Sequence, residues 1–362
     1  MKTNQFVRQQ RNLFKGVQTF MAKLTIKEIA RMAGVSPSAV SIVVNNRKGV
    51  SEPTRARVMD IVEKLNYYPN PSSRRLLFNK TNNIGILFKK NASPMEHFFY
   101  SELNSVILQE CEALGYNLIF SSLEYNNKTN EITLPNVVNY RDVDGVIFYG
   151  DIDIQIINKF NTMDIPFIIV DSHNRSEDIL SVSADYYEAS YTATKYLISI
   201  GHMSIAFIGT SLIPFYGNQT FFGFKKAIEE NRISLPINWI QLDAFDENSS
   251  YLCMKNILSY NQAPTAIVCS ADIYAIGAMR CLKDNNYKIP DDMSIIGIDD
   301  IILDQYVEPA LSTIKIDKVE MGKSAIDLLI KKIENEKTGN QIITSNELVI
   351  RRSTKPVKDT KV

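Results

Sequence analysis

Residues 24–50, LTIKEIARMAGVSPSAVSIVVNNRKGV, predict two short helices joined by a tight turn. Thr25 and Glu28 have the spacing of a capping box, which satisfies backbone N–H groups at a helix start. Gly34 suits a turn that requires positive φ, and Ser36 is the expected N-cap of the second helix. Apolar residues at helical spacing form the inward faces of the two helices: Ile26, Ile29, Ala30, Ala33, Val40, Val43 and Val44.

Two helices joined in this way form a helix-turn-helix, whose second helix enters the major groove of DNA. Ser51 is the expected cap of a third helix that extends through Leu65. The alternative is a small helical bundle without a ligand, which we disfavour because small residues on an exposed helix face contribute little to folding. The side chains expected to point outward from the second helix are Ser38, Ala39, Ser41, Ile42 and Asn45.

Charge divides the chain into a basic first part and an acidic remainder. Residues 1–80 hold 15 lysines and arginines against 4 acidic residues, whereas residues 81–362 hold 25 against 36. A basic module joined to an acidic body implies a polyanionic partner for the module. DNA is such a partner, because contacts to phosphates supply most of the non-specific affinity.

The length of 362 residues is sufficient for two or three domains. The four cysteines lack the spacing of metal ligands, so we expect buried thiols in a reducing compartment, no metal site and no cofactor. No apolar run reaches the roughly 18 residues of a membrane span, and residues 1–20 lack the apolar core of a secretory signal. We therefore expect a cytoplasmic protein. Either translation begins at Met21, or residues 1–20 form a basic arm that contacts DNA.

A segment with two prolines follows the third helix. Pro69 and Pro71 end that helix, and residues 72–78 could form one short helix that is too short to be stable alone. Two alternatives are open for Leu76 and Leu77. They could wedge between base steps in the minor groove, or they could anchor a plain linker onto the body.

From residue 83 onward, apolar strands alternate with amphipathic helices in two series. Such a pattern indicates parallel sheets that are covered on both faces. We predict an α/β protein with two doubly wound lobes and a cleft at the carboxyl ends of the strands. The expected strands are 84–88, 116–120, 144–149 and 166–171 in the first series and 205–209, 266–269 and 294–299 in the second. Residues at such ends are Tyr149, Asp171, Asp272 and Asp299.

The sequence carries no enzyme motif that we recognise. It has no Walker loop, no G-x-G-x-x-G, no G-x-S-x-G and no H-E-x-x-H. The three histidines are scattered along the chain. Asp299 and Asp300 are adjacent in a strand, so their side chains point to opposite faces and cannot form an acid/base pair. We therefore expect a protein that is not an enzyme.

From Leu24 onward the chain resembles the LacI/GalR (lactose-repressor/galactose-repressor) family. The likeness rests on motifs in the family's order and spacing, including IKEIARMAGVSPSAVS, VSEPTRARV, LNYYPN, VDGVI, ISIGHMSIAFIG, IPDDMSIIGIDD and PALSTI. The resemblance implies a dimeric transcription repressor that binds a palindromic operator and has a body like periplasmic sugar-binding proteins. It also implies a small ligand in the cleft, a sugar or sugar derivative, that changes lobe closure and thereby the hinge helix.

The resemblance assigns roles to residues of the DNA-binding part. Phosphate or backbone contacts fall on Thr25, Ser36, Ser41, Asn45, Thr54 and Tyr67. Base edges are read at Pro37, Ser38 and Ile42. Leu76 falls on the family's intercalating leucine, which favours the wedge over the linker anchor. Ile42 departs from the family, which usually has arginine there, so we predict a different operator half-site. The predicted interface also includes Ala39, Arg47, Asn70 and Ser73.

The resemblance also assigns roles in the cleft. Asp299 matches the family's ligand-binding aspartate, whose carboxylate can accept hydrogen bonds from two hydroxyls. Thr220 stands where the family commonly has a ligand-binding arginine, which favours a neutral, hydroxyl-rich ligand over an anion. Ala184 and Asp185 replace the family's Asp-Asn pair. The predicted ligand site contains Phe99, Tyr100, Tyr149, Asp171, Thr220, Phe245, Asp272 and Asp299, and ordinary core packing is the alternative for its phenylalanines and Tyr100.

The predicted domains are an N-terminal extension (1–21), a helix-turn-helix domain (22–70), a hinge helix with linker (71–82), an effector-binding and dimerisation domain (83–355) and a tail (356–362). In the effector domain we expect one lobe from 83–183 and 313–343, and the other from 184–312 and 344–355. Two alternative functions are open. One is a regulator controlled by a protein partner, such as a phosphorylated sugar-transport carrier. The other is a soluble sugar-binding protein without a regulatory role.

Overall fold

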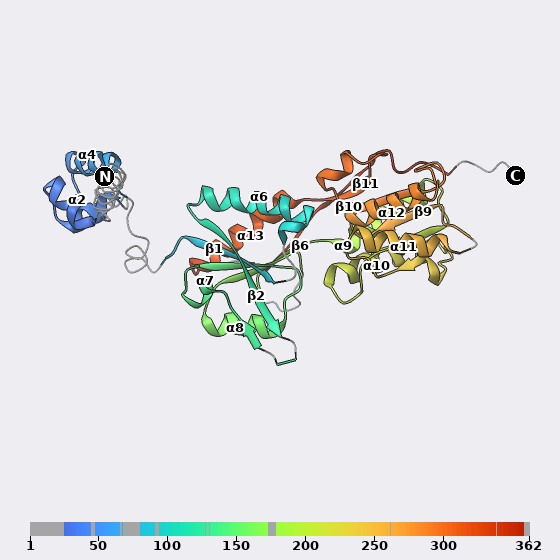
Figure 1. Cartoon of the computed structure of the whole chain (residues 1–362), viewed down its shortest axis with the longest axis horizontal. Coiled ribbons are helices and arrows are strands. Elements are labelled where there is room, and N and C mark those ends of the chain that lie inside the picture. Colours follow the sequence, from blue (N-terminus) through green and yellow to red (C-terminus); the bar gives the residue numbers. More distant parts are fainter. Residues whose placement is uncertain are drawn as a thin grey trace, which may run out of the picture. The chain divides into compact units, whose positions relative to one another are not determined.

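The computed structural model in Figure 1 describes residues 25–44, 48–65, 67, 80–90, 94–126, 128–129, 131–172, 179–260, 262–337 and 339–357. The chain divides into two compact units, Met1–Thr81 and Asn82–Val362. Residues 1–20, most of the predicted hinge (71–79) and five predicted DNA contacts lie outside the described residues. These five contacts are Asn45, Arg47, Asn70, Ser73 and Leu76.

The first unit begins with the predicted capping signals. The Thr25 N–H donates to Glu28 Oε2 at 2.7 Å and the Glu28 N–H donates to Thr25 Oγ1 at 3.4 Å, which confirms the capping box. Gly34 has a φ of 62°, and the Ala39 N–H donates to Ser36 Oγ at 3.2 Å, so the turn and the second cap are confirmed as well. The helices are α2 (Ile26–Ala33), α3 (Pro37–Val44) and α4 (Glu52–Lys64).

These three helices enclose a small core. One sequence-based detail is wrong: Ser51 occupies the N-cap position of α4, but its hydroxyl does not bond to a backbone N–H of the helix. The hydroxyl instead forms a hydrogen bond of 2.9 Å with Thr54 Oγ1, which lies within its reach in the first turn. The buried core residues are Ile29, Ala30, Ala33, Val40, Val43, Val58 and Tyr67.

The second unit contains two mostly parallel sheets, which confirms the predicted α/β architecture (Figure 1). In the first sheet only β3 is antiparallel to its neighbour, and the strand order is β12-β6-β5-β4-β1-β2-β3. Its strands are β1 (Asn83–Lys89), β2 (Asn117–Asn126), β3 (Glu131–Thr133), β4 (Gly145–Tyr149), β5 (Phe167–Val170), β6 (Ser181–Ala184) and β12 (Gln341–Thr344). Helices α6 (Phe98–Ala113) and α13 (Lys318–Ile333) cover one face, and α7 (Asn136–Asn139) and α8 (Ile154–Met163) cover the other.

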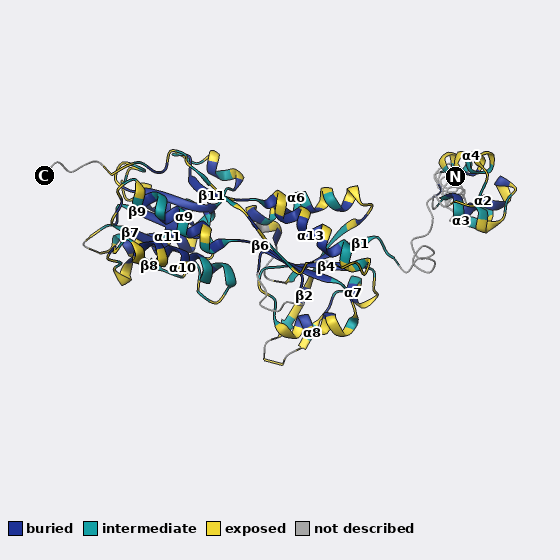
Figure 2. Cartoon of the chain, turned by 180° about the vertical axis from the view of Figure 1, so that it is seen from behind, coloured by how far each residue is buried: buried dark blue, intermediate teal, exposed yellow. Residues whose placement is uncertain are grey.

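The second sheet has the order β13-β11-β10-β9-β7-β8, with only β13 antiparallel. Its strands are β7 (Ile205–Ile208), β8 (Ile240–Gln241), β9 (Ala266–Cys269), β10 (Ser294–Asp299), β11 (Ser312–Ile316) and β13 (Asn346–Val349). Helices α9 (Tyr186–Ser199) and α10 (Phe215–Glu230) cover one face, and α11 (Glu247–Leu258) and α12 (Asp272–Asp284) cover the other. Three short 3-10 helices are η1 (Pro94–Glu96), η2 (Ile237–Trp239) and η3 (Ile302–Gln305). Buried residues concentrate on the strands and the inner helix faces (Figure 2).

The chain passes between the two lobes after β6, after β11 and after β12. The second of these crossovers corrects the expected lobe boundary at residue 313. β11 pairs in parallel with β10 of the second sheet up to residue 315, where Lys315 lies opposite Asp299. Residues 313–316 therefore belong to the second lobe, and the chain returns to the first lobe at Asp317.

All four cysteines are free thiols and are buried. Within the described ranges, no cluster of histidine, cysteine or acidic side chains has the arrangement of a metal site. Over the same part of the chain, no helix combines the length and apolar character needed to cross a membrane.

Candidate functional site

The predicted DNA-reading residues lie on the side of α3 that faces away from the core. Ser36, Pro37 and Ser38 are exposed, and Ser36 Oγ and Ser38 Oγ are hydrogen-bonded at 2.8 Å. Ala39, Ser41 and Ile42 are half-buried. The sequence of α3, PSAVSIVV, contains no charged residue. The side chains of this helix can therefore offer a base edge only hydroxyl and apolar contacts.

The other described DNA-contact candidates lie around α3. Thr25 is exposed and takes part in the capping box, whose hydrogen bonds lower the pKa of Glu28. Thr54 is half-buried in the first turn of α4. Tyr67 is only 8% exposed and packs in the core of the unit, and this burial raises the pKa of its hydroxyl. The structure thus places Thr25 at the surface and most of Tyr67 in the core.

The second unit contains a cavity of about 490 Å³ between its two lobes. Residues from the start of α6 and the end of β5 line it on one side, and residues after β7, β9 and β10 line it on the other. The structure brings five of the predicted ligand residues together at this cavity: Phe99, Tyr100, Asp171, Phe245 and Asp299.

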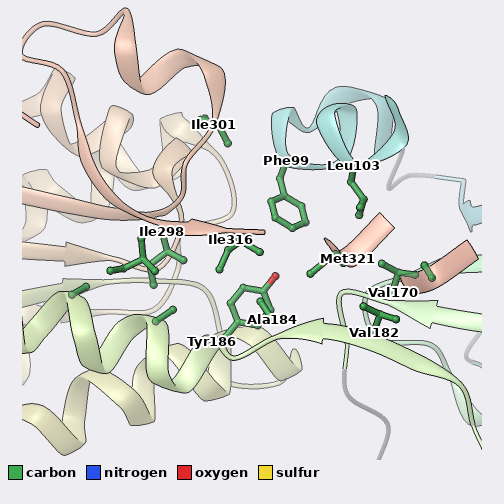
Figure 3. Close-up of a cluster of buried hydrophobic side chains, with 14 of the residues drawn as sticks. Phe99, Leu103, Val170, Val182, Ala184, Tyr186, Ile298, Ile301, Ile316 and Met321 are labelled. Carbon is green, nitrogen blue, oxygen red and sulfur yellow. The ribbon is translucent and has the colours of Figure 1, made fainter. Parts of the chain in front are cut away.

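Asp171 is a buried carboxylate on the first-lobe side of the cavity. It follows β5 with a φ of 66°, and it accepts hydrogen bonds from the hydroxyls of Tyr100, at 2.6 Å, and Tyr186. Burial raises the pKa of Asp171 to about 6, although the two tyrosine hydrogen bonds act in the opposite direction. Figure 3 shows Tyr186 and Phe99 pointing toward one another where the two lobes meet.

Asp299 ends β10 on the second-lobe side. Its φ of 130° is rarely adopted by a residue with a side chain, and such strain is often found at ligand sites. Lys318 Nζ donates to the Asp299 carbonyl oxygen at 2.6 Å and lies 3.3 Å from Glu102 Oε2. Burial, followed by the nearby Asp272, raises the pKa of the Asp299 carboxyl well above its usual range. In the described contacts, no lysine or arginine forms an ion pair with the Asp299 carboxyl oxygens, because Lys318 bonds to the Asp299 backbone oxygen instead.

The structure does not place three predicted ligand residues in the cavity. The Tyr149 hydroxyl donates to Asn104 Oδ1 at 2.6 Å, and its ring stacks on Tyr100. Thr220 is fully buried and donates to a backbone carbonyl in α10. Asp272 is also fully buried, and its Oδ1 accepts from the Thr313 hydroxyl at 2.7 Å. These three side chains bond to neighbouring groups of the fold instead of lining the cavity.

Several residues at the cavity were missed by sequence reasoning. Tyr216 and Tyr274 form a hydroxyl pair at 2.9 Å, and the buried Ser270 Oγ has no hydrogen-bond partner among the described residues. Most of these residues lie just after a strand or in the first turn of a helix, which is the signal that could have identified them. The full set is His97, Phe98, Tyr186, Thr210, Tyr216, Asp246, Glu247, Ser270, Ala271, Ile273, Tyr274 and Ile301.

Comparison with known proteins agrees with both halves of this architecture. Residues 25–70 match the profile of bacterial regulatory proteins of the lacI family, and residues 194–354 match a periplasmic binding protein-like domain. The chain is 31% identical over 342 residues to the HTH-type transcriptional repressor PurR of Haemophilus influenzae (strain PittEE). That alignment covers 92% of this chain and 99% of the relative.

Solved structures show the same fold. The lac repressor dimer bound to operator and the anti-inducer ONPF has a TM-score of 0.79 at 24% identity, covering 92% of this chain and 99% of that one. A LacI family regulator from Enterococcus faecium, solved with bound ribose, has a TM-score of 0.66 at 26% identity, covering 76% and 100%. The protein is thus a DNA-binding transcriptional repressor and not an enzyme, and it belongs to the lacI family of bacterial regulatory proteins.

Proposed function

We propose that the chain represses transcription as a homodimer on a palindromic operator, under the control of a small ligand in the cavity between its lobes. Two copies would present their α3 helices to successive major grooves, roughly 34 Å apart. Residues 71–82 are the proposed hinge helix with its linker, and Leu76 is the proposed wedge between base steps. Because the two binding events are coupled, operator and ligand each change the affinity for the other by the same factor.

The cavity lining supports a sugar or sugar derivative as the ligand. The observation that carries this proposal is that Asp299 lines the same cavity as several aromatic rings. Carboxylates accept hydrogen bonds from sugar hydroxyls, and aromatic rings stack on the apolar faces of sugars. No lysine or arginine is among the described lining residues, so a phosphate would have no cationic partner there. The Enterococcus faecium regulator with bound ribose favours the same ligand class.

Calorimetry with the purified full chain tests the ligand. We expect binding heat from a neutral sugar in a panel that includes ribose and glucose, and none from glucose 6-phosphate. An Asp299→Asn variant should bind the same sugar more weakly. No heat from any sugar, together with binding to a phosphorylated transport carrier, would instead support control by a protein partner. Sugar binding without any operator binding would support a non-regulatory sugar-binding protein.

Ile42 supports an operator that differs from the family's usual half-site. An isoleucine can contact a thymine methyl, whereas an arginine would bond to guanine. Selection of genomic fragments by the purified protein, followed by sequencing, should recover one palindrome. Repeating the selection with Ile42→Arg should change the base preferred in each half-site. An unchanged half-site would remove Ile42 from the set of base-reading residues.

A further inference from the structure

Several hydrogen bonds join the lobes, among them those of Tyr186 to Asp171 and of Lys318 to the backbone after β10. Two others lie at the edges of the cavity, and each pairs a carboxylate of the first lobe with a backbone N–H of the second. The Phe215 N–H donates to Asp151 Oδ2 at 2.7 Å. The Ile302 N–H donates to Glu102 Oε1 at 3.0 Å. Each donor is next in sequence to a residue of the cavity lining, Tyr216 and Ile301 respectively.

The chemistry of α10 explains why Asp151 is needed at one of these positions. The first N–H groups of a helix have no partner within the helix, and a residue before the helix usually caps them. Pro214 stands at that N-cap position and forms no side-chain cap. The carboxylate from the opposite lobe takes over this task for Phe215, and a negative charge is favourable at a helix N-terminus.

Both carboxylates are held in place by a second contact. The Ser172 hydroxyl donates to Asp151 Oδ1, so Ser172 orients the carboxylate from its own lobe. Lys318 Nζ lies 3.3 Å from Glu102 Oε2 and also donates to the backbone oxygens of Asp299 and Asp300 across the crossover. In each carboxylate, one oxygen therefore contacts Ser172 or Lys318 of the first lobe, and the other accepts a hydrogen bond from the second lobe.

From this geometry we propose that Asp151 and Glu102 are the positioning residues that hold the two lobes closed over the cavity. Hydrogen bonds to an ionised acceptor are stronger than neutral ones, and both bonds must break when the lobes separate. The effect on ligand affinity rests on the proposed function, whereas the effect on the distance between the lobes does not. If the ligand binds the closed state, its apparent affinity rises with the fraction of molecules that is already closed.

The distance between the lobes in the free full chain tests the proposal without DNA or ligand. Exposed Lys159 on α8 and Lys255 on α11 can be replaced by cysteine and spin-labelled, because the four native cysteines are buried. We expect Asp151→Ala and Glu102→Ala each to move the distance distribution to longer values. Asp151→Asn and Glu102→Gln keep an oxygen acceptor and should restore much of the closed population.

Matched controls are available in the first lobe. Asp153 is two residues from Asp151, but its Oδ2 pairs with Lys89 Nζ at 2.8 Å in the same lobe. Glu124 likewise pairs with Lys90 in the same lobe. Asp153→Ala and Glu124→Ala should leave the distance distribution unchanged.

Unchanged distances in both Asp151→Ala and Glu102→Ala would overturn the proposal. So would an equal shift in the controls, since the effect would not then depend on the lobe-to-lobe bonds. With a sugar found by calorimetry, each alanine variant should bind about 5- to 10-fold more weakly. A lengthened distance in a protein that binds no sugar would leave Asp151 and Glu102 as closing residues and refute only the proposed ligand.

Discussion

The two compact units of the chain place their functional residues in opposite ways. The first unit has a small core that includes Ile29, Val40 and Val58, and most of its described candidate DNA contacts lie at the start or on the outer side of α3, whose inner face contributes to that core. The second unit buries its candidate ligand residues between two lobes, and Asp171 and Asp299 are separated by more than a hundred residues of sequence. A surface site can therefore be inferred from local signals, whereas an interior site depends on topology.

The largest expected effect tests whether the two units are independent. Ile29 is fully buried in the small core, so Ile29→Ala should destabilise the first unit by about 2–5 kcal/mol. We expect operator binding to be lost while sugar binding and the unfolding transition of the second unit stay as in the wild type. Calorimetric unfolding with operator and sugar titrations measures both. Met32→Ala, at a 54% exposed position of the same helix, is the control. A shift of both unfolding transitions would show that the units are coupled.

A pH titration tests the effect of a buried carboxyl in the second unit on its stability. The Asp171 pKa is raised to about 6 by burial, so the folded state binds this proton more tightly than the unfolded state. Its contribution to the free energy of unfolding is therefore full below pH about 4 and is lost as the pH rises through about 6. Relative to Asp171→Asn, the wild type should be about 3 kcal/mol more stable at low pH than at pH 7. Urea unfolding at both pH values measures this, and a constant difference would contradict it.

Phe245 is an exception within the second unit, because it lines the cavity but is 68% exposed. Phe245→Ala should weaken sugar binding about tenfold, or about 1.4 kcal/mol, through lost stacking. The unfolding free energy of the second unit should change little. Leu252→Ala, at a 59% exposed position outside the cavity lining, should alter neither quantity. Equal losses of affinity in the two variants would mean that stacking on Phe245 is not the cause.

The smallest expected effect concerns the capping box. Thr25→Ala removes the side-chain acceptor for the Glu28 N–H and should destabilise the first unit by about 1 kcal/mol. Thr25→Ser keeps the hydroxyl and should retain most of the stability. The melting temperature of the first unit measures this. If Thr25→Ala lowers operator affinity more than this loss of stability explains, its hydroxyl also contacts DNA.

Sequence reasoning predicted the caps at Thr25 and Ser36, the turn at Gly34 and the alternating strands, because each depends on neighbouring residues. It located Asp171 and Asp299 correctly at the cavity, since parallel strands end at the same edge of a sheet. It failed for Asp272, because a residue after a strand can face either the cleft or the sheet. Asp272 faces β10, where a Cβ on Gly297 would lie 2.0 Å from its Oδ1. Only the packing of α12 against β10 decides between the two orientations.

The uncharged sequence of α3 has a consequence for the ionic-strength dependence of operator binding. Each phosphate that a lysine or arginine neutralises releases counterions, and this release sets the slope of log affinity against log salt. α3 supplies no such side chain. Changes of base in the half-site should therefore shift the affinity at every salt concentration by the same factor. The slope of log affinity against log salt should instead depend on the lysines and arginines elsewhere in residues 1–80.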